Sequence, residues 1–325
     1  MEALRKLPTV LTAEELIDKV FRRASKTTGG NLKERTINKL STISNVSKDY
    51  FKRVIASHPS YESLPSFYRE MVDLVVGIES IKKALSSLHW ADEMIQKIIN
   101  RAIADVRKGK NPLEVYRSAC GRISSIIEDI DEELRFLNEA KQKMREIPSL
   151  REMPTVVVAG SPNVGKSSFV SLVSTAKPEI AEYPFTTQRI IVGYTSEIQI
   201  LDTPGILDRP LEKRSAIEKK AILCLRNVAD AILFIIDPTE TCGYTLKSQL
   251  SLLEEIKKAF GKSTLEVYSK SDLHSFRDRM AFSAKNGEGV EEILKEITKI
   301  AKKNYSQTST VIADSGQTST QEQHS

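Results

Sequence analysis

A short stretch of the sequence, GSPNVGKSS at residues 160–168, constrains the fold more than any other. It follows TVVVAG, a β-branched run typical of a strand buried on both faces, and it leads into a helical stretch expected over 166–175. The pattern G-x-x-x-x-G-K-[ST] between a strand and a helix is that of a phosphate-binding loop. Its glycines let backbone N–H groups point inward, and the N-terminus of the following helix favours an anion. The chain must therefore arrange a strand, a tight turn and a helix around a nucleotide phosphate.

Beyond this loop, short apolar runs alternate with helical stretches. The runs are RIIVGYT at 189–195, EIQILD at 197–202, AILFIID at 231–237, TLEVYS at 264–269 and the weaker RMAFS at 279–283. Helical stretches lie between most of them, at 212–227, 245–260 and 289–303. This alternation predicts a mainly parallel sheet with helices on both faces, over residues 151–303. The first two runs are too close together for a crossover helix, so we expect one antiparallel hairpin at the sheet edge.

Residues 1–150 show helical periodicity and almost no strand signal. Two apolar stripes recur at threes and fours: Met71, Leu74, Val75, Ile78, Ile81, Leu85 and Leu88, then Ile123, Ile127, Ile130, Leu134 and Leu137. Gly and Pro mark breaks at 27–30, 58–60, 109–112 and 147–149. We expect an all-α bundle of four or five helices, with long partners at about 31–57 and 113–146. His89 and Trp90 are interpreted as packing residues.

Residues 304–325 are polar and low in complexity, which predicts a disordered tail.

The first residues lack the apolar core of a signal peptide, and no apolar run is long enough to span a bilayer. The odd count of three cysteines, without paired spacing, fits reduced thiols rather than a disulfide frame or a zinc site. We therefore expect a monomeric, cytoplasmic protein with no membrane segment.

Positive charge is concentrated at one end of the chain. Residues 1–60 hold 12 Lys and Arg against 6 Asp and Glu, whereas the net charge of the whole chain is +5. Such a bias suggests contact with a polyanion, although a solvated helical surface accounts for it equally well.

Two further segments have the spacing of nucleotide switches. Lys166 would supply a charge to the β- and γ-phosphates, and the Ser167 hydroxyl would bind Mg²⁺. In PFTTQ at 184–188, a Thr hydroxyl would bind Mg²⁺ and its N–H the γ-phosphate. In DTPG at 202–205, Asp202 would hold Mg²⁺ through water and the Gly205 N–H would sense the γ-phosphate. These segments are of the kind that orders on triphosphate binding.

The motif SKSD at 269–272 indicates which base is bound. The Asp272 carboxylate can accept from guanine N1–H and N2–H₂ together, and a site built around a buried carboxylate rejects adenine. Lys270 would lie along the base, and an N–H from Ala284 or Lys285 in FSAK would hold guanine O6. The five segments, in this order, predict a GTPase domain that binds GTP with Mg²⁺.

These segments resemble those of translation-factor-class GTPases, and PFTT with DTPGILD resembles the Obg group. The stretches GSPNVGKSSFV, YPFTTQRIIVGYT, DTPGILDRPLEKR and DPTETCGYTLKSQLSL resemble the nucleolar GTP-binding protein 1 family, including its archaeal members. The resemblance covers nearly the whole chain before residue 304, and it implies a role in maturation of the large ribosomal subunit.

The resemblance also implies a set of nucleotide-binding residues. The phosphate loop would comprise Gly160, Ser161, Pro162, Asn163, Val164, Gly165, Lys166, Ser167 and Ser168. The switches would comprise Phe185, Thr186 and Thr187, then Asp202, Thr203, Pro204 and Gly205. The base would be read by Ser269, Lys270, Asp272, Ser283, Ala284 and Lys285. Thr187 is taken as the switch ligand of Mg²⁺, with Thr186 as the alternative. Ser269 departs from the Asn usual in this motif, so we expect a weaker tie to the phosphate loop and reduced guanine affinity.

Catalysis is assigned to Lys166, Thr187 and Gly205, without a general base. Ras-type enzymes place a Gln directly after the second-switch Gly to orient water, and Ile206 stands there in this chain. We therefore expect slow intrinsic hydrolysis, with the missing group supplied by a protein partner or by an ion. Asn163 leaves two roles open: it binds K⁺, as in some GTPases with Asn at this point, or it only stabilises the turn.

Three functions compete at this stage. In the first, the basic bundle contacts rRNA of the large ribosomal subunit precursor and the GTPase domain times release. In the second, the chain is an Obg-like regulatory GTPase with a soluble protein partner and no stable ribosome contact. In the third, it is a nucleotide-binding scaffold, which the switch motifs argue against.

Overall fold

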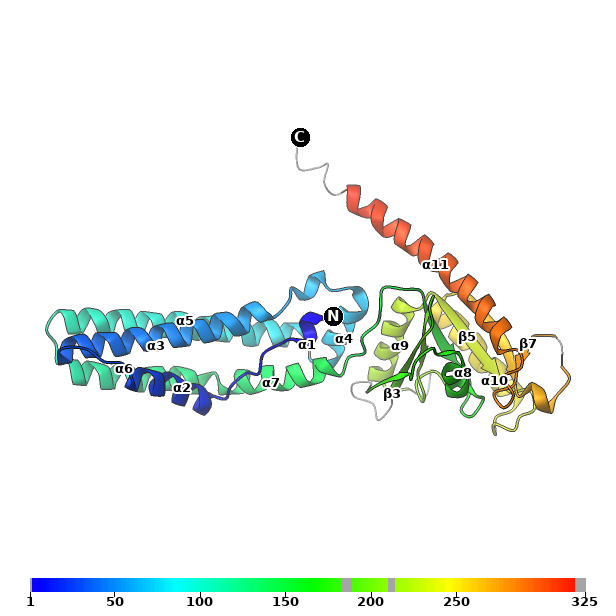
Figure 1. The fold of residues 1–325 in the computed structure, drawn as a ribbon, viewed down its shortest axis with the longest axis horizontal. Helices are drawn as coiled ribbons and strands as arrows, with labels where there is room; N and C mark the ends of the chain where they lie inside the picture. Colours follow the sequence, from blue (N-terminus) through cyan, green and yellow to red (C-terminus); the bar gives the residue numbers. More distant parts are fainter. Residues whose placement is uncertain (1, 183–188, 210–213, 277, 319–325) are drawn as a thin grey trace. The chain divides into compact units, whose positions relative to one another are not determined.

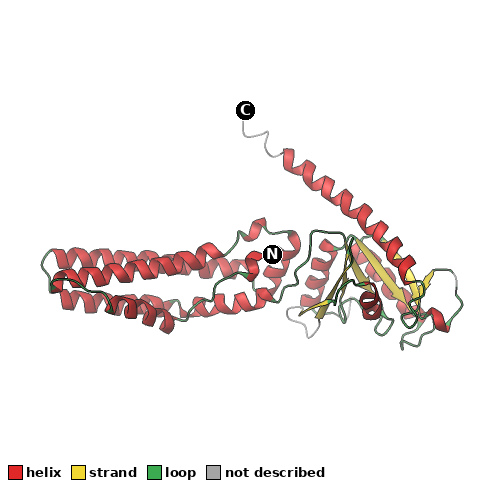
Figure 2. Ribbon diagram, viewed as in Figure 1, coloured by secondary structure: helices red, strands yellow, loops and turns green. Residues whose placement is uncertain are grey.

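The structure, a computed structural model, describes residues 2–182, 189–209, 214–276 and 278–318 (Figure 1). Its chain divides into two compact units, Met1–Arg145 and Glu146–Ser325. Figure 2 shows that helices make up the first unit and that the strands all lie in the second.

The first unit is a helical bundle. Its helices are α1 Glu2–Arg5, α2 Ala13–Ser25, α3 Leu32–Ser57, α4 Ser66–Val75, α5 Ile78–Arg107, α6 Pro112–Asp129 and α7 Asp131–Arg145. The long helix α5 packs against α3, α6 and α7, as Figure 1 shows. The predicted stripe from Ile123 to Leu137 is buried throughout, which confirms its place in the core.

The helix boundaries differ from expectation at two points. The stripe predicted from Met71 to Leu88 is split, because Gly77 adopts a φ of 86° and ends α4 before α5 begins. The N–H groups of Val76 and Gly77 both donate to the carbonyl of Val72, which closes the last turn of α4. The partner expected over 113–146 is likewise two helices, which meet at Ile130.

The interpretation of His89 and Trp90 as packing residues is wrong. Trp90 is 46% exposed, and the exposed His89 lies 3.5 Å from Glu93 across one helical turn. Both occupy the outward side of α5, whose opposite side carries the buried Leu88, Ala91 and Ile95. A single apolar ring next to a buried stripe gives no sequence signal of which side it faces.

The second unit contains one seven-stranded sheet of order β2-β3-β4-β1-β5-β6-β7. Its strands are β1 Thr155–Ala159, β2 Glu179–Glu182, β3 Arg189–Tyr194, β4 Gln199–Asp202, β5 Ala231–Ile236, β6 Thr264–Ser269 and β7 Met280–Phe282. β1 pairs in parallel with β4 and β5, and β5, β6 and β7 continue in parallel. The α/β fold class, mainly parallel with an antiparallel β3–β4 hairpin, is confirmed. The hairpin is not the edge, however, because the unpredicted strand β2 pairs outside β3.

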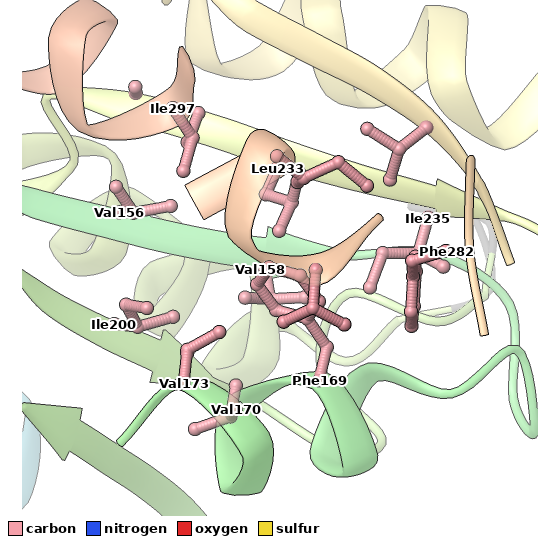
Figure 3. Close-up of a cluster of buried hydrophobic side chains, with 14 of the residues drawn as sticks. Val156, Val158, Phe169, Val170, Val173, Ile200, Leu233, Ile235, Phe282 and Ile297 are labelled. Carbon is pink, nitrogen blue, oxygen red and sulfur yellow. The ribbon is translucent and has the colours of Figure 1, made fainter. Parts of the chain in front are cut away.

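Helices cover both faces of this sheet. They are α8 Lys166–Val173, α9 Ala216–Val228, α10 Leu246–Phe260 and α11 Val290–Thr318. α8 and α11 bury one face, where Val158, Leu233 and Phe282 form the cluster drawn in Figure 3. The alternate residues of β5, Ile232, Phe234 and Ile236, point the other way and are equally buried, and α10 packs on β5 there.

The prediction of a disordered tail from residue 304 is wrong for its first part, because α11 continues through Thr318. Asn304 itself is anchored: its side-chain N–H donates to Asp230 O at 2.8 Å and to Ser263 Oγ at 3.0 Å. A helix already docked on the sheet propagates through polar residues at little cost per residue, which composition alone does not reveal. Residues 319–325 lie outside the described part of the chain. Within that part, no helix combines the length and apolarity that crossing a membrane requires.

Candidate nucleotide-binding site

The sequence motifs meet at the carboxyl edge of the sheet. Val158 of β1 is in register with Asp202 of β4, and Ser269 of β6 with Phe282 of β7. The loops that follow these strands therefore emerge side by side, at the position where open α/β sheets bind ligands. An open pocket of about 410 Å³ lies there, lined by Pro162, Asn163, Gly165, Lys166, Ser167, Ser168, Pro204 and Asp208.

The phosphate loop has a backbone that its residue types explain. Gly160 has a φ of 140°, and a Cβ there would lie 2.4 Å from Ile235 O. Gly165 begins α8 with a φ of 101°, and Asn163 adopts a φ of 61°, which Asn tolerates better than most residues. Val164 turns into the hydrophobic core and Ser161 is buried, so these two shape the loop from behind.

Lys166 is held over this loop. Its Nζ donates to the carbonyl oxygens of Gly160 and Ser161, each at 2.8 Å. Burial lowers the pKa of Lys166, while the nearby Asp202 and Asp208 carboxylates oppose that shift. The ammonium therefore lies at the pocket wall, within a site where a phosphate oxygen would be a charged acceptor for it.

Ser167 and Asp202 form a pair that fits a metal ion. Ser167 Oγ donates to Asp202 Oδ2 at 2.5 Å. Asp202 is fully buried, burial raises its pKa, and within the described residues its Oδ1 has no hydrogen-bond partner. A hydroxyl, one carboxylate and phosphate oxygens are hard donors of the kind that Mg²⁺ takes. The residues present therefore fit Mg²⁺.

The second switch is more elaborate than its motif suggests. The Gly205 N–H donates to Asp208 Oδ2 at 2.7 Å, and Thr203 is buried behind it. Arg214 reaches back over the segment, with Nη1 donating to Gly205 O at 3.1 Å and Nη2 to Arg209 O at 2.6 Å. Ile206 is fully buried, and its side chain is not among those that line the pocket.

The predicted first switch cannot be compared with the structure. Phe185, Thr186 and Thr187 lie outside the described residues, so the metal and catalytic roles assigned to Thr187 remain predictions.

The base-reading segments are tied to each other. Ser283 Oγ donates to Asp272 Oδ1 at 2.7 Å and accepts from the Lys285 N–H at 3.2 Å. The hydrogen bond from Ser283 lowers the pKa of Asp272, so this carboxylate is an anion at neutral pH. Asp272 is exposed, although the sequence argument pictured a buried carboxylate, because both loops end at the open edge of the sheet. Ala284 lies in the chain between Ser283 and Lys285, which make these two hydrogen bonds.

Ser269 and Lys270 make contacts that the motif does not foretell. Ser269 is buried, and its Oγ donates to Ile236 O at 3.3 Å, at the end of β5. Lys270, with a φ of 60°, places its Nζ 2.7 Å from both Asp237 Oδ2 and Thr241 Oγ1. The base-reading loop is thus tied to the segment after β5.

An aromatic pair connects the base-reading loop with the phosphate loop. The rings of Phe169 on α8 and Phe282 on β7 meet edge-on, with centroids 5.1 Å apart. Figure 3 labels both side chains. Phe282 directly precedes Ser283, and its ring tip lies beneath Gly165. Packing of this kind fixes the two loops relative to each other.

Sequence reasoning missed Asp208, Arg214 and Asp237. The run DTPGILD does contain Asp208, but nothing in its spacing shows that the chain curls back to Gly205. Asp237 directly follows β5 and precedes a Pro, which is a weak signal of a site at the sheet edge.

The fold and this edge define the class of the chain: a P-loop α/β domain of the GTPase type that follows an all-helical domain. A family model described as the NOG1 N-terminal helical domain matches residues 4–150, and one described as nucleolar GTP-binding protein 1 matches residues 216–272. The chain belongs to the nucleolar GTP-binding protein 1 family.

Two relatives and one solved structure illustrate how far the similarity extends. An uncharacterised protein of Methanocaldococcus jannaschii is 42% identical over 282 residues, which cover 83% of this chain and 81% of that protein. Nucleolar GTP-binding protein 1 of Arabidopsis thaliana is 33% identical over 76% of this chain, but this covers only 38% of the plant protein. A crystal structure of nucleolar GTP-binding protein 1 from Plasmodium falciparum is 32% identical, with a TM-score of 0.44 over 53% of this chain and 97% of that one. The chain thus spans most of its archaeal relative and less than half of the plant one.

Proposed function

We propose that this chain is a monomeric, cytoplasmic GTPase that binds GTP with Mg²⁺ and acts as a switch in maturation of the large ribosomal subunit. The observation that carries GTP binding is the Ser167–Asp202 pair, at 2.5 Å. Ser167 lines one pocket together with the buried Lys166. The names of the eukaryotic relatives support GTP as the nucleotide.

Each residue in the site then has a task. Backbone N–H groups of the loop and Lys166 bind the phosphates, and Ser167 with Asp202 holds Mg²⁺, directly and through water. Mg²⁺, when bound, neutralises charge that develops on the phosphates. Thr187 and the Gly205 N–H bind the γ-phosphate, and Asp272 reads the guanine base together with an N–H from Ala284 or Lys285.

Hydrolysis is proposed to be slow without a further group. Ile206 is buried and apolar, so it cannot orient the attacking water. The missing group comes from an unidentified protein partner or from K⁺ near Asn163. The φ of 61° at Asn163 accounts for its presence on conformational grounds alone, so the ion needs its own test. Hydrolysis that is faster in K⁺ than in Na⁺ supports the ion, and equal rates remove it.

Contact with rRNA is proposed for the basic part of the bundle. A surface pocket of about 470 Å³ is lined by Lys19, Arg22 and Arg23 of α2, by Lys26 directly after it, and by the carboxylates of Glu15 and Asp18. Arg53 of α3 lies nearby. Lys19 Nζ and the Arg53 guanidinium lie 5.3 Å and 5.8 Å from the centroid of the Tyr50 ring. Burial, with repulsion from Arg53 and Arg23, lowers the pKa of Lys19. Crowded cations of this kind are stabilised by phosphates.

Co-sedimentation with large-subunit particles tests this function. The protein is mixed with particles in the presence of a non-hydrolysable GTP analogue, of GDP, or of no nucleotide, at several salt concentrations. Pelleting that requires the analogue, fades in GDP and weakens steeply with salt supports the proposal. An absence of pelleting in every nucleotide state at low salt contradicts it, and leaves an Obg-like GTPase with a soluble partner.

A charge variant locates the contact. Lys19, Arg23 and Arg53 are changed together to Ala, and the matched control changes Lys82, Lys97 and Arg135, which each pair with a carboxylate within the bundle. Pelleting lost in the first variant and kept in the control places the rRNA contact on α2 and α3. Equal effects of the two variants contradict that location.

A further inference from the structure

The second switch contains a carboxylate on the N–H that the proposed function gives to the γ-phosphate. Asp208 Oδ2 accepts the Gly205 N–H at 2.7 Å, and the Asp208 side chain is only 14% exposed. The same carboxylate lines the phosphate pocket together with Lys166 and Ser167. It also lies close enough to Lys166 to act electrostatically on that ammonium.

One N–H cannot serve two anions. The proposed function gives the Gly205 N–H to the γ-phosphate, and here the Asp208 carboxylate holds it. Hydrogen bonds between an N–H and an anionic oxygen are short and strong, and two anions forced together in a partly buried site repel each other. A triphosphate must therefore displace Asp208, whereas a diphosphate, which ends at the β-phosphate, need not.

The structure offers the displaced carboxylate a second partner. Arg214 Nη2 lies 4.0 Å from Asp208 Oδ1, and the Arg214 side chain is fully buried. Within the described residues, Arg214 Nε has no hydrogen-bond partner. A small movement of Asp208 toward Arg214 would pair these two charges. The carboxylate that leaves the Gly205 N–H therefore has another partner close by.

We propose that Asp208 is a specificity-determining residue for the phosphate end of the nucleotide, because it occupies the Gly205 N–H with a diphosphate and yields it only to a γ-phosphate. This inference rests on the proposed function, since it presumes that the pocket binds GTP and GDP. It differs from the role given to Gly205, because it adds a competitor that sets the ratio of the two affinities. The consequence is a site that favours GDP more than the phosphate loop alone would.

Equilibrium binding of GDP and of guanylyl imidodiphosphate, each with Mg²⁺, tests the proposal in the full chain. The quantity compared is the ratio of the two dissociation constants. In Asp208→Ala the Gly205 N–H is free, so affinity for the triphosphate analogue should rise relative to GDP by at least about fivefold, the effect of losing one competing charged hydrogen bond. Asp208→Asn keeps an oxygen within reach but no charge, and should shift the ratio in the same direction by less.

Two controls separate the outcomes. Glu218 pairs with Arg209 near the same switch, and not with Gly205. Glu218→Gln therefore removes a negative charge there and should leave the ratio of the two dissociation constants unchanged. Thermal unfolding of each variant shows that it is folded, and Asp208→Asn serves if Asp208→Ala is not. An unchanged or lowered preference for the analogue in the folded Asp208 variants overturns the inference while GTP binding stands. A wild-type chain that binds neither nucleotide overturns the proposed function, and this inference with it.

Discussion

The Nζ of Lys270 lies 2.7 Å from Oδ2 of Asp237, which joins the base-reading loop to the segment that follows β5. Asp237 is fully buried and also accepts from the N–H groups of Thr239 and Cys242. Gln249 of α10 braces the same turn, donating to Asp237 O at 2.9 Å and accepting from the Asp237 N–H at 2.8 Å. The segment from Asp237 to Cys242 thus holds Lys270 in place, in a chain where Ser269 replaces the usual Asn.

Asp237→Asn should weaken binding of GDP and GTP alike, by about tenfold, because one charge-assisted hydrogen bond to Lys270 is lost. Discrimination between guanine and hypoxanthine nucleotides should persist, since Asp272 carries it. Isothermal titration with GDP and IDP measures both quantities. Asp278→Asn, which breaks the exposed pair with Arg279, is the matched control and should leave both affinities intact. Unchanged GDP affinity in Asp237→Asn would show that this pair does not position Lys270.

The same carboxylate predicts a pH dependence of stability. Burial on its own raises the pKa of Asp237, but hydrogen bonds from Lys270, Thr239 and Cys242 outweigh it and lower the pKa from 3.8 to about 2. A carboxyl group with a depressed folded-state pKa stabilises the fold fully above its unfolded pKa, and this stability is lost as pH falls from about 4 toward 2. Wild type should therefore exceed Asp237→Asn in free energy of unfolding at pH 6, by a margin that narrows below pH 4. A margin constant from pH 6 to pH 2.5 would exclude an ionised Asp237 as its source.

Asp272→Asn should change the base that the site accepts. In the proposed site the carboxylate of Asp272 accepts from two guanine donors. An amide offers one acceptor and one donor and so matches xanthine, whose O2 replaces the amino group. Affinity for GDP should fall by at least about a hundredfold, while affinity for xanthosine diphosphate rises. Ser283→Ala, which removes only the hydroxyl that donates to Asp272, should reduce GDP affinity without any gain for xanthine. If Asp272→Asn binds GDP as wild type does, the base is read elsewhere.

Gly160 should tolerate no side chain. A Cβ at Gly160 would lie 2.4 Å from Ile235 O, in a backbone with φ of 140°. Gly160→Ala should therefore lower the free energy of unfolding by about 2–4 kcal/mol, the combined effect of overpacking and backbone strain. Gly121, inside α6, has nothing within 4 Å of such a Cβ, and Gly121→Ala should stabilise the chain by about 0.5–1 kcal/mol. Urea unfolding of both variants gives the comparison, which fails if they shift stability in the same direction.

Much of this fold could be predicted from the sequence because its signals are local. Strand runs such as AILFIID and the loop around Lys166 state their conformation through β-branching, glycine positions and spacing. The edge strand β2, Glu179–Glu182, was not predicted. It is short, and it pairs with β3 through backbone groups, which leave no pattern in the sequence. The continuation of α11 beyond Asn304 was not predicted either. It extends a helix that is already docked on the sheet, and its own composition does not indicate a helix.

The site divides in the same way. Lys166, Ser167 and Asp202 were found because motif and strand context fix them together. The sequence did not indicate Asp208, Arg214 or Asp237. Asp208 and Arg214 act through a turn that returns their side chains to the backbone of Gly205. Asp237 acts through a contact with Lys270, 33 residues away in the sequence. Tertiary contacts of this kind leave no periodicity to detect.

Ile206 provides the last prediction, because it occupies the position of the water-orienting Gln of Ras-type enzymes. Restoring that Gln should not restore its function. Ile206 is fully buried, and its N–H donates to Thr203 O at 3.0 Å, which turns the side chain into the core. Ile206→Gln would bury an amide without partners, at a cost of about 1–3 kcal/mol in stability, and should leave the rate of GTP hydrolysis unchanged or lower. Ile206→Val is the matched control, with about 0.5–1.5 kcal/mol lost and the same rate. Single-turnover hydrolysis and thermal unfolding measure the two effects. A faster rate in Ile206→Gln would mean that the second switch turns this side chain outward during catalysis, and that slow hydrolysis is set by the residue type at 206 rather than by its burial.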